Sequence, residues 1–309
     1  MSLEHPYAPI VRNQPARDRN GPIRAVVFNA AGGARVEQIA RRLSQPPLTD
    51  ASIILLCEAD WRTARSRRRE VASELASLLG MSMAYLPEFT RQMGGAHDHT
   101  NQRACMGNAI LSSAPLDDIR VIAMPDPHPE SARNLRRDYA GGFAGLVVRA
   151  RFGGEPIWIG VAHLHSRCAP AGRAAQMDAF LKGFPQDGPA IFGGDLNSTT
   201  TDLMHPASFA RTFATMLINP QRFKNPQRYE PIFERLAAAG FQIDGANALG
   251  RPTFTFSGAI PTLFRPRLDW IALRGIRAQA GSAQVVAAQE SFASRRFSDH
   301  DLITVAMEI

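Results

Sequence analysis

Polar side chains suited to chemistry follow short apolar runs at several distant points of the chain. Residues 23–29 and 52–58 have the apolar content of buried strands, and they end on Asn29 and Glu58. Strand-like runs also lie beside the other polar groups, which are Asp195 with Asn197, Asp269, and the segment Ser298-Asp299-His300-Asp301. Each of these side chains can therefore lie where a buried strand emerges at a surface, so the pattern favours an α/β fold.

Helical spacing of apolar residues alternates with the strand-like runs. Helices are predicted at residues 36–43, 67–79, 173–181 and 231–240. We expect residues 1–22 to form a poorly ordered arm and residues 87–107 to form a long loop. Residues 199–230 form an excursion that contains several prolines. Because the polar groups come from both halves of the chain, residues 23–309 are predicted to be a single domain.

The net charge of the chain favours a polyanionic partner. The formal charge is +7 and the sequence pI is about 10.0, which indicates attraction to nucleic acid or to an anionic surface. Lysine occurs only at Lys182 and Lys224, so arginine supplies almost all of the basic charge. A GC-rich genome would produce the same bias, and the two explanations remain open at this point.

Cysteine spacing and hydropathy bear on the compartment. Cys57, Cys105 and Cys168 lie far apart and form no Cys-x-x-Cys pair, which disfavours a zinc cluster or a disulfide framework. The first twenty-two residues contain no apolar signal core, and no apolar stretch approaches the roughly 20 residues needed to cross a bilayer. We therefore expect a cytoplasmic protein without integral membrane association.

The polar residues at the strand ends are the types that metal-assisted phosphoryl chemistry requires. Carboxylate and amide oxygens are good ligands for a hard divalent cation. An imidazole can face a phosphate, and a further carboxylate can orient or activate a water molecule. The residue set therefore predicts attack of water on a phosphoric ester.

A series of motifs carries a resemblance to a known family. In order, they are Phe28-Asn29, Leu56-Cys57-Glu58, Gly107-Asn108-Ala109-Ile110-Leu111-Ser112, Ala162-His163-Leu164, Gly194-Asp195-Leu196-Asn197, Leu268-Asp269-Trp270 and Ser298-Asp299-His300. The chain resembles the endonuclease/exonuclease/phosphatase (DNase I-like) superfamily from about residue 23 to 309. That superfamily includes nucleases, deadenylases, neutral sphingomyelinases and inositol-polyphosphate phosphatases. The resemblance implies a four-layered α/β sandwich of two packed mixed β-sheets flanked by helices.

The resemblance also implies a role for each site residue. The implied metal ligands, for Mg²⁺ or alternatively Mn²⁺, are Asn29, Glu58 and Asp299. The implied catalytic residues are His163, Asp195, Asn197, Asp269 and His300. Asp195 would take a proton from the attacking water while Asn197 aligns that water. His163 and His300 would stabilise the transition state, and Asp269 would orient His300 and raise its pKa.

Several of these residues also have a purely structural explanation. Asp195 and Asn197 could form an Asx-turn, and Glu58 could cap the loop that follows it. His165 could join the site or be a solvated loop residue, and His97 and His99 form a weak candidate for a zinc site. Aromatic residues that could stack on single-stranded nucleic acid are Phe223, Tyr229 and Phe264.

Two positions depart from the family pattern. Cys57 replaces the glutamine that often precedes the metal-binding glutamate, and Ala31 replaces an acidic residue that some nucleases carry. Neither change removes the core residues. We therefore expect a Mg²⁺-dependent phosphoric-ester hydrolase, namely a phosphodiesterase or nuclease acting on a phosphodiester substrate. The alternatives are a sphingomyelinase-like phospholipid phosphodiesterase and a non-catalytic nucleic-acid- or lipid-binding protein on the same fold.

Overall fold

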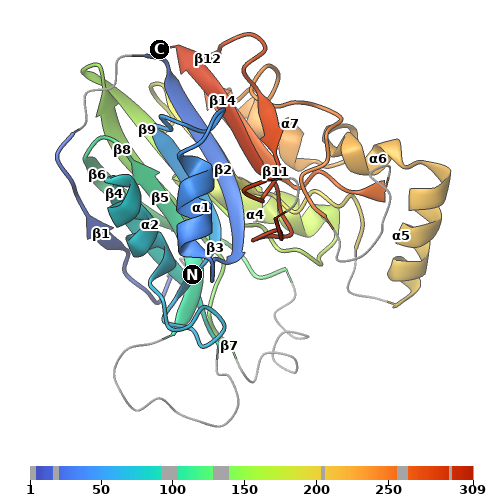
Figure 1. Ribbon diagram of the computed structural model, residues 1–309. Helices are drawn as coiled ribbons and strands as arrows, with labels where there is room; N and C mark the ends of the chain where they lie inside the picture. Colours follow the sequence, from blue (N-terminus) through green and yellow to red (C-terminus); the bar gives the residue numbers. More distant parts are fainter. Residues whose placement is uncertain are drawn as a thin grey trace.

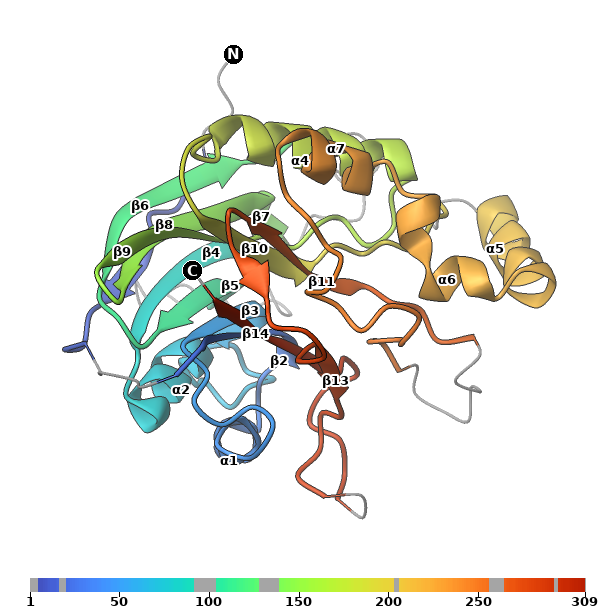
Figure 2. The same cartoon turned by 90° about the horizontal axis from the view of Figure 1, so that it is seen from above.

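The protein forms two packed β-sheets covered by helices on both outer faces (Figures 1 and 2). The structure is a computed structural model. It describes residues 5–16, 21–91, 104–127, 139–202, 206–255, 264–291 and 294–308. The helices of the described residues are α1 (Val36–Leu43), α2 (Val71–Leu79), α4 (Pro170–Gly183), α5 (Pro206–Ile218), α6 (Gln221–Lys224) and α7 (Ile232–Ala238), with a 3₁₀ turn at Pro226–Arg228. The predicted α/β sandwich is confirmed.

The first sheet is mixed and runs in the order β1-β4-β5-β3-β2-β14-β12, with β7 beside β4 and β13 beside β14. Its strands are β1 (Ile10–Arg12), β2 (Ile23–Gly32), β3 (Ile53–Trp61), β4 (Ser82–Arg91), β5 (Cys105–Ser112), β7 (Tyr139–Gly141), β12 (Arg277–Ala278), β13 (Gln284–Val286) and β14 (Leu302–Glu308). β2 and β3 are parallel, whereas β14 is antiparallel to β2.

The second sheet runs in the order β11-β10-β9-β8-β6. Its strands are β6 (Leu116–Ala123), β8 (Ala144–Phe152), β9 (Glu155–Val161), β10 (Ala190–Asp195) and β11 (Asp269–Arg274). β9 and β10 are parallel, and β11 is antiparallel to β10. Both sheets are therefore mixed, as the resemblance implies.

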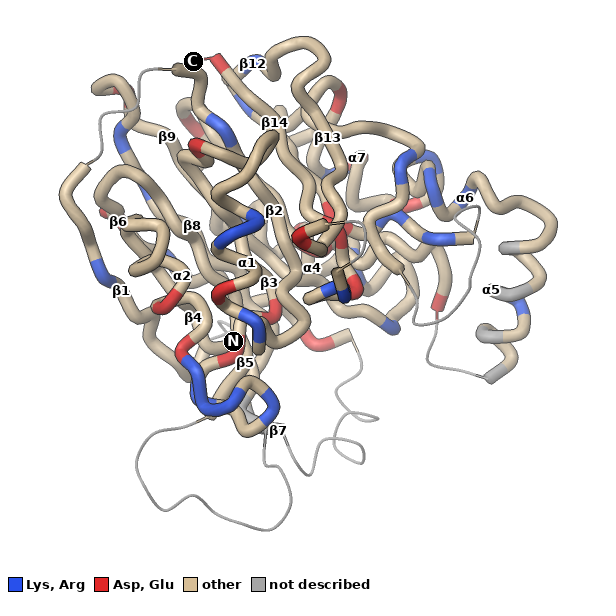
Figure 3. The backbone as a smooth tube through the Cα atoms, in the orientation of Figure 1, with Lys and Arg blue, Asp and Glu red and all other residues tan. Residues whose placement is uncertain are grey.

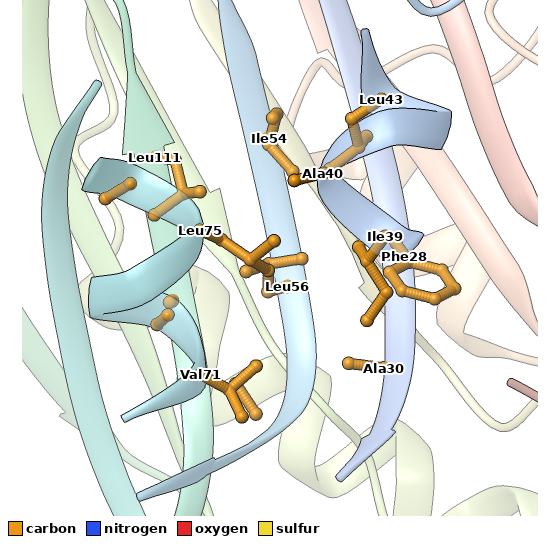
Figure 4. Close-up of a cluster of buried hydrophobic side chains, with 14 of the residues drawn as sticks. Phe28, Ala30, Ile39, Ala40, Leu43, Ile54, Leu56, Val71, Leu75 and Leu111 are labelled. Atoms are coloured by element: carbon orange, nitrogen blue, oxygen red, sulfur yellow. The ribbon is translucent and has the colours of Figure 1, made fainter. Parts of the chain in front are cut away.

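Three apolar clusters separate the four layers. One lies between the first sheet and α1 and α2, where Phe28 and Ile39 pack beside Leu56 and Leu75 (Figure 4). A second fills the space between the two sheets, and a third packs α4 and α7 on the second sheet. The strands buried on both faces explain the continuous apolar runs of the sequence, since neither face meets water.

Some expectations on local structure were wrong. Within the predicted N-terminal arm, Ile10–Arg12 pair with β4 as an edge strand, because the backbone of residues 83–85 is free to accept them on that side. Within the predicted loop 87–107, β4 continues to Arg91 and β5 begins at Cys105. Pro87 and the register shift that follows it hide the strand from a pattern-based reading, since proline is uncommon inside strands.

Candidate active site

Parallel strand pairs bring the first site residues to one edge of the sandwich. Asn29 and Glu58 lie on the neighbouring parallel strands β2 and β3. His163 follows β9, and Asp195 ends the parallel strand β10. The two pairs meet across the sheets, because the Asn29 amide nitrogen donates to Asp195 Oδ2 at 2.9 Å. Parallel strands end on the same side of a sheet, which is why these residues gather there.

Antiparallel strands complete the site because they begin where their neighbours end. Asp269 opens β11 and is paired with Asp195 across the ladder. His300 lies two residues before β14, which runs antiparallel to β2. Gly193 lets the sheets approach closely below the site, since a side-chain carbon there would lie 2.7 Å from Val27 Cγ2. The chain therefore brings together the predicted residues of both halves.

Asp195 is the centre of this arrangement. Its side chain is buried, and Oδ2 lies 3.6 Å from His300 Nε2 and 3.7 Å from His163 Nε2. Oδ1 accepts the backbone N–H of Asn197 at 3.0 Å, so the Asx-turn reading of this segment is correct and coexists with the site. Asp195 thus presents one oxygen to two imidazoles and one amide, which is a suitable position for a proton acceptor.

Asn197 follows Asp195 with a left-handed backbone, at φ 47°. Its side-chain nitrogen donates to Leu164 O at 2.8 Å, which ties the loop after β10 to the loop after β9. That bond fixes the orientation of the amide, and its Oδ1 is the acceptor of Asn197 suited to align a water. Strain in a left-handed asparagine is small, because this residue type tolerates the conformation.

His300 and Asp269 form the tightest contact of the site. Nδ1 of His300 lies 2.8 Å from Asp269 Oδ2, and Asp269 is fully buried. Burial alone would lower the pKa of His300, but Asp269 and Asp195 outweigh it and raise the pKa to about 10. Burial also raises the pKa of Asp269, whereas the His300 charge opposes that rise. The pair therefore holds His300 as an oriented imidazolium at neutral pH.

His163 is held more loosely. Its Nε2 lies 4.0 Å from Glu58 Oε1 as well as 3.7 Å from Asp195 Oδ2, both beyond hydrogen-bond distance. Burial works to lower the pKa of His163, but the charges of Asp195, Glu58 and Glu88 together raise it. This imidazole lies 3.7 Å or more from both carboxylates, so Nε2 is open to contact a phosphate oxygen.

Glu58 and Asn29 supply oxygen atoms to the same edge. Glu58 lies at a register irregularity of β3 with φ 52°, and its side chain remains 27% exposed. The Asn29 amide nitrogen contacts both Glu58 Oε1, at 3.4 Å, and Asp195 Oδ2. The strained backbone of Glu58 keeps its carboxylate accessible, and the Asp195 carboxylate lies beside the same amide. A bound cation would offset the repulsion between the two carboxylates, so this arrangement suits a cation.

The three predicted metal ligands differ from the group of described residues whose possible ligand atoms lie close to one another. Asp195, Asp269 and His300 offer atoms within 4.8 Å of one another, but two of these residues already pair with each other. Asp299 is exposed at the rim, with Oδ1 3.5 Å from Ser298 Oγ. Its charge helps to raise the pKa of His300, which places it near the site. The assignment of Asn29, Glu58 and Asp299 as metal ligands stays a prediction.

Glu88 is a site-adjacent residue that the sequence reading missed. It lies on β4, is fully buried, and accepts the Ala144 backbone N–H at 3.2 Å through Oε1. Burial raises its pKa to about 8, with the charge of His163 opposing the rise. The available signal was a glutamate between Leu86-Pro87 and Phe89, which the prediction of a loop over residues 87–107 concealed.

The structure bears in different ways on the other residues predicted for the site or for substrate binding. His165 Nδ1 accepts the backbone N–H groups of Arg167 and Cys168, and its ring contacts Phe143 with centroids 5.1 Å apart. Its role in the site stays a prediction. Phe223 is buried, at 3% exposure, and so does not offer a stacking surface. His97 and His99 lie outside the described residues.

A buried ion pair supports the loops that carry the site. Arg173 of α4 pairs with Glu230, and both side chains are fully buried. Arg173 also donates to Cys168 O, in the loop after His163, and to Thr201 O, in the loop after Asp195. Because a buried guanidinium needs its acceptors, this residue fixes the two loops relative to each other.

Comparison with known proteins identifies the family and supports the fold. The model of the Endonuclease/Exonuclease/phosphatase family matches residues 26–300. A protein of that family from Beutenbergia cavernae DSM 12333 superposes with a TM-score of 0.62 at 15% identity, over 94% of this chain and 72% of its own. No curated protein matches the chain. None of the helices in the described part of the chain is long and apolar enough to span a membrane.

Two further structures share the fold. D. rerio TDP2 complexed with single-strand DNA product has a TM-score of 0.52 at 16% identity, over 94% of this chain and 100% of its own. Sphingomyelinase C from Streptomyces griseocarneus has a TM-score of 0.51 at 16% identity, over 93% and 99%. Identities this low establish a common fold and no common substrate.

Proposed function

Because the chain belongs to the Endonuclease/Exonuclease/phosphatase family, we propose that it is a divalent-metal-dependent hydrolase of phosphodiesters. The observation that carries the proposal is the position of the Asp195 carboxylate, which lies 3.6 and 3.7 Å from two imidazoles and 2.9 Å from the Asn29 amide. A carboxylate and two imidazole rings around one small volume suit the activation of water beside a phosphate.

The residues of this chain divide the work as follows. Asp195 accepts the proton of the attacking water, and Asn197 aligns that water through Oδ1. His300, kept as an imidazolium by Asp269, stabilises the charge that develops on the phosphate oxygens. His163 contacts a second phosphate oxygen.

Asn29, Glu58 and Asp299 are the residues that would hold Mg²⁺ or Mn²⁺. Their oxygen atoms suit such ions. When bound, the ion supplies neutralisation of phosphate charge and polarisation of the P–O bond. The Asn29 amide nitrogen, which contacts the carboxylates of Glu58 and Asp195, would then link the ion site to Asp195.

The positive charge of the chain favours a polyanionic substrate. Nucleic acid is the first candidate and phospholipid headgroups are the second, since TDP2 and sphingomyelinase C share the fold. Binding that tracks a phosphate backbone weakens steeply with salt, so a salt titration of binding distinguishes nucleic acid from a neutral lipid headgroup.

The test is hydrolysis of bis-p-nitrophenyl phosphate and of single- and double-stranded DNA with Mg²⁺, with Mn²⁺ and with EDTA. The monoester p-nitrophenyl phosphate serves as the comparison substrate. We expect release of p-nitrophenol from the diester with either metal ion and none with EDTA. Turnover that persists unchanged in EDTA, or turnover of the monoester alone, would contradict the proposal.

A further inference from the structure

The end of α5 exposes two adjacent aliphatic side chains. Leu217 is 59% exposed and Ile218 is 85% exposed, which makes Ile218 the most exposed large apolar residue of the described chain. α5 projects away from both sheets in each view of the molecule (Figures 1 and 2). Tyr229, at 41% exposure, lies beside this end because its hydroxyl is 3.4 Å from the Asn219 side chain.

The charge of this region has one sign. Residues 203–229 contain Arg211, Arg222, Lys224 and Arg228 and neither aspartate nor glutamate. Arg211 lies on α5 and two further basic residues lie on α6, and neither helix carries an acidic residue (Figure 3). Glu230, which follows, is buried against Arg173 and does not reach the surface. The helical excursion, defined as residues 206–229, therefore combines a basic surface with an apolar end.

The helical excursion is joined to the loop that follows Asp195. Arg222 donates through Nε to Thr200 Oγ1 at 2.9 Å and through Nη2 to Thr200 O at 3.1 Å. The same guanidinium lies over the Tyr229 ring, 4.8 Å from its centroid. A partner that binds the helical excursion would therefore lie on the same side of the molecule as the loop that follows Asp195.

We propose that the helical excursion docks the protein on anionic lipid bilayers, with Leu217 and Ile218 entering at the boundary between headgroups and acyl chains. Basic residues gain from the negative surface potential of such a bilayer, while aliphatic side chains gain from its hydrocarbon. A second copy of this chain fits less well, because two basic surfaces repel each other. Nucleic acid satisfies the charges but leaves the aliphatic end in water.

Co-sedimentation with vesicles tests this docking, with the full chain in EDTA so that no turnover occurs. The vesicles contain phosphatidylcholine alone or phosphatidylcholine with phosphatidylserine. We expect binding to the anionic vesicles only. The double variant Leu217→Ser/Ile218→Ser should bind them at least about tenfold more weakly, and Arg211→Gln/Arg228→Gln should lose about fivefold for each charge removed.

Matched controls exist elsewhere on the surface. Leu78 of α2 is also exposed, at 57%, and Arg151 is exposed in the β8–β9 hairpin at the opposite end of the strands. Leu78→Ser and Arg151→Gln should bind the anionic vesicles like the wild type. Equal binding by the Leu217→Ser/Ile218→Ser variant, or no wild-type binding to either vesicle, would overturn the proposal.

A second copy of this chain and nucleic acid, as alternative partners of the helical excursion, would each give a different experimental result. A dimer in analytical ultracentrifugation that Leu217→Ser/Ile218→Ser converts to a monomer would overturn the docking in favour of a second copy. Loss of single-stranded DNA binding in that variant, without vesicle binding by the wild type, would overturn it in favour of nucleic acid. Hydrolysis of a soluble diester should be unchanged in the variant, so the docking and the proposed function can fail separately.

Discussion

The two histidines beside Asp195 lie at nearly equal distances from it but are held in different ways. His300 Nε2 is 3.6 Å and His163 Nε2 is 3.7 Å from Asp195 Oδ2. Asp269 fixes the other nitrogen of His300 at 2.8 Å, whereas the contact of His163 with Glu58 is 4.0 Å long. One ring is therefore fixed in orientation and charge, and the other can adjust to a substrate. The site combines a preorganised imidazolium with a more loosely held imidazole.

Removing each ring tests whether this difference matters for catalysis. We expect His300→Ala to lower kcat about 10³-fold, because it removes a preorganised charge from the transition state. His163→Ala should lower kcat by about 10²-fold, within the range for a positioned side chain. Both variants are compared with wild type by steady-state hydrolysis of bis-p-nitrophenyl phosphate, after circular dichroism confirms folding. A larger loss for His163→Ala would reverse the comparison.

His163 lies near a predicted metal ligand, Glu58, which is not among the ion-pair partners of His300. Glu58→Gln should raise the Mg²⁺ concentration needed for half-maximal activity by about 10- to 100-fold. The matched control is Glu155→Gln, an exposed glutamate that begins β9 at the opposite end of the strands. An unchanged Mg²⁺ dependence in Glu58→Gln would remove that residue from the ion site.

The pH dependence of activity tests the fixed ring. The imidazolium of His300 is present below its pKa of about 10 and is lost only as the pH rises through that value. Asp269→Asn removes an influence that raises this pKa, while burial, which lowers it, remains. The alkaline fall in kcat should therefore move to lower pH by at least about one unit. A fall at the same pH in the variant would show that Asp269 does not set the charge of His300.

The last effect is expected on stability rather than on activity, at Glu88 behind His163. Its pKa is about 8 in the folded protein against an ordinary value of 4.5. Between these values the unfolded chain releases the proton and the folded protein keeps it, so stability falls as the pH rises. Gln is neutral in both states, so Glu88→Gln should gain stability relative to wild type from pH 5 to pH 8, on the order of a few kcal/mol. Thermal melts at both values measure this gain, and a constant difference would contradict it.

Sequence reasoning could predict the fold and the assembly of the site because both depend on strand order. An apolar run marks each strand that carries a site residue. Asn29 and Glu58 lie three residues before the ends of β2 and β3, Asp195 ends β10 and Asp269 begins β11. The family resemblance then selected the sandwich among other α/β folds. The structure confirms the sandwich and brings the predicted residues together, while their individual roles stay predictions.

Features that depend on long-range packing could not be predicted in this way. Glu88 becomes part of the surroundings of His163 only because β4 lies next to β5 and near β8, which no local pattern encodes. The pairing of Ile10–Arg12 with β4 is of the same kind. Phe223 was expected in a stacking surface and is buried instead, as part of the short helix α6, and its backbone carbonyl accepts the Arg267 N–H.

The most direct test of the account is the rate of bis-p-nitrophenyl phosphate hydrolysis by Asp195→Asn in Mg²⁺, beside wild type. Asn is close in shape to Asp but cannot accept the proton of water. The account predicts a fall in kcat of at least about 10³-fold with an unchanged circular dichroism spectrum. Wild-type activity in the folded variant would contradict the central role of Asp195.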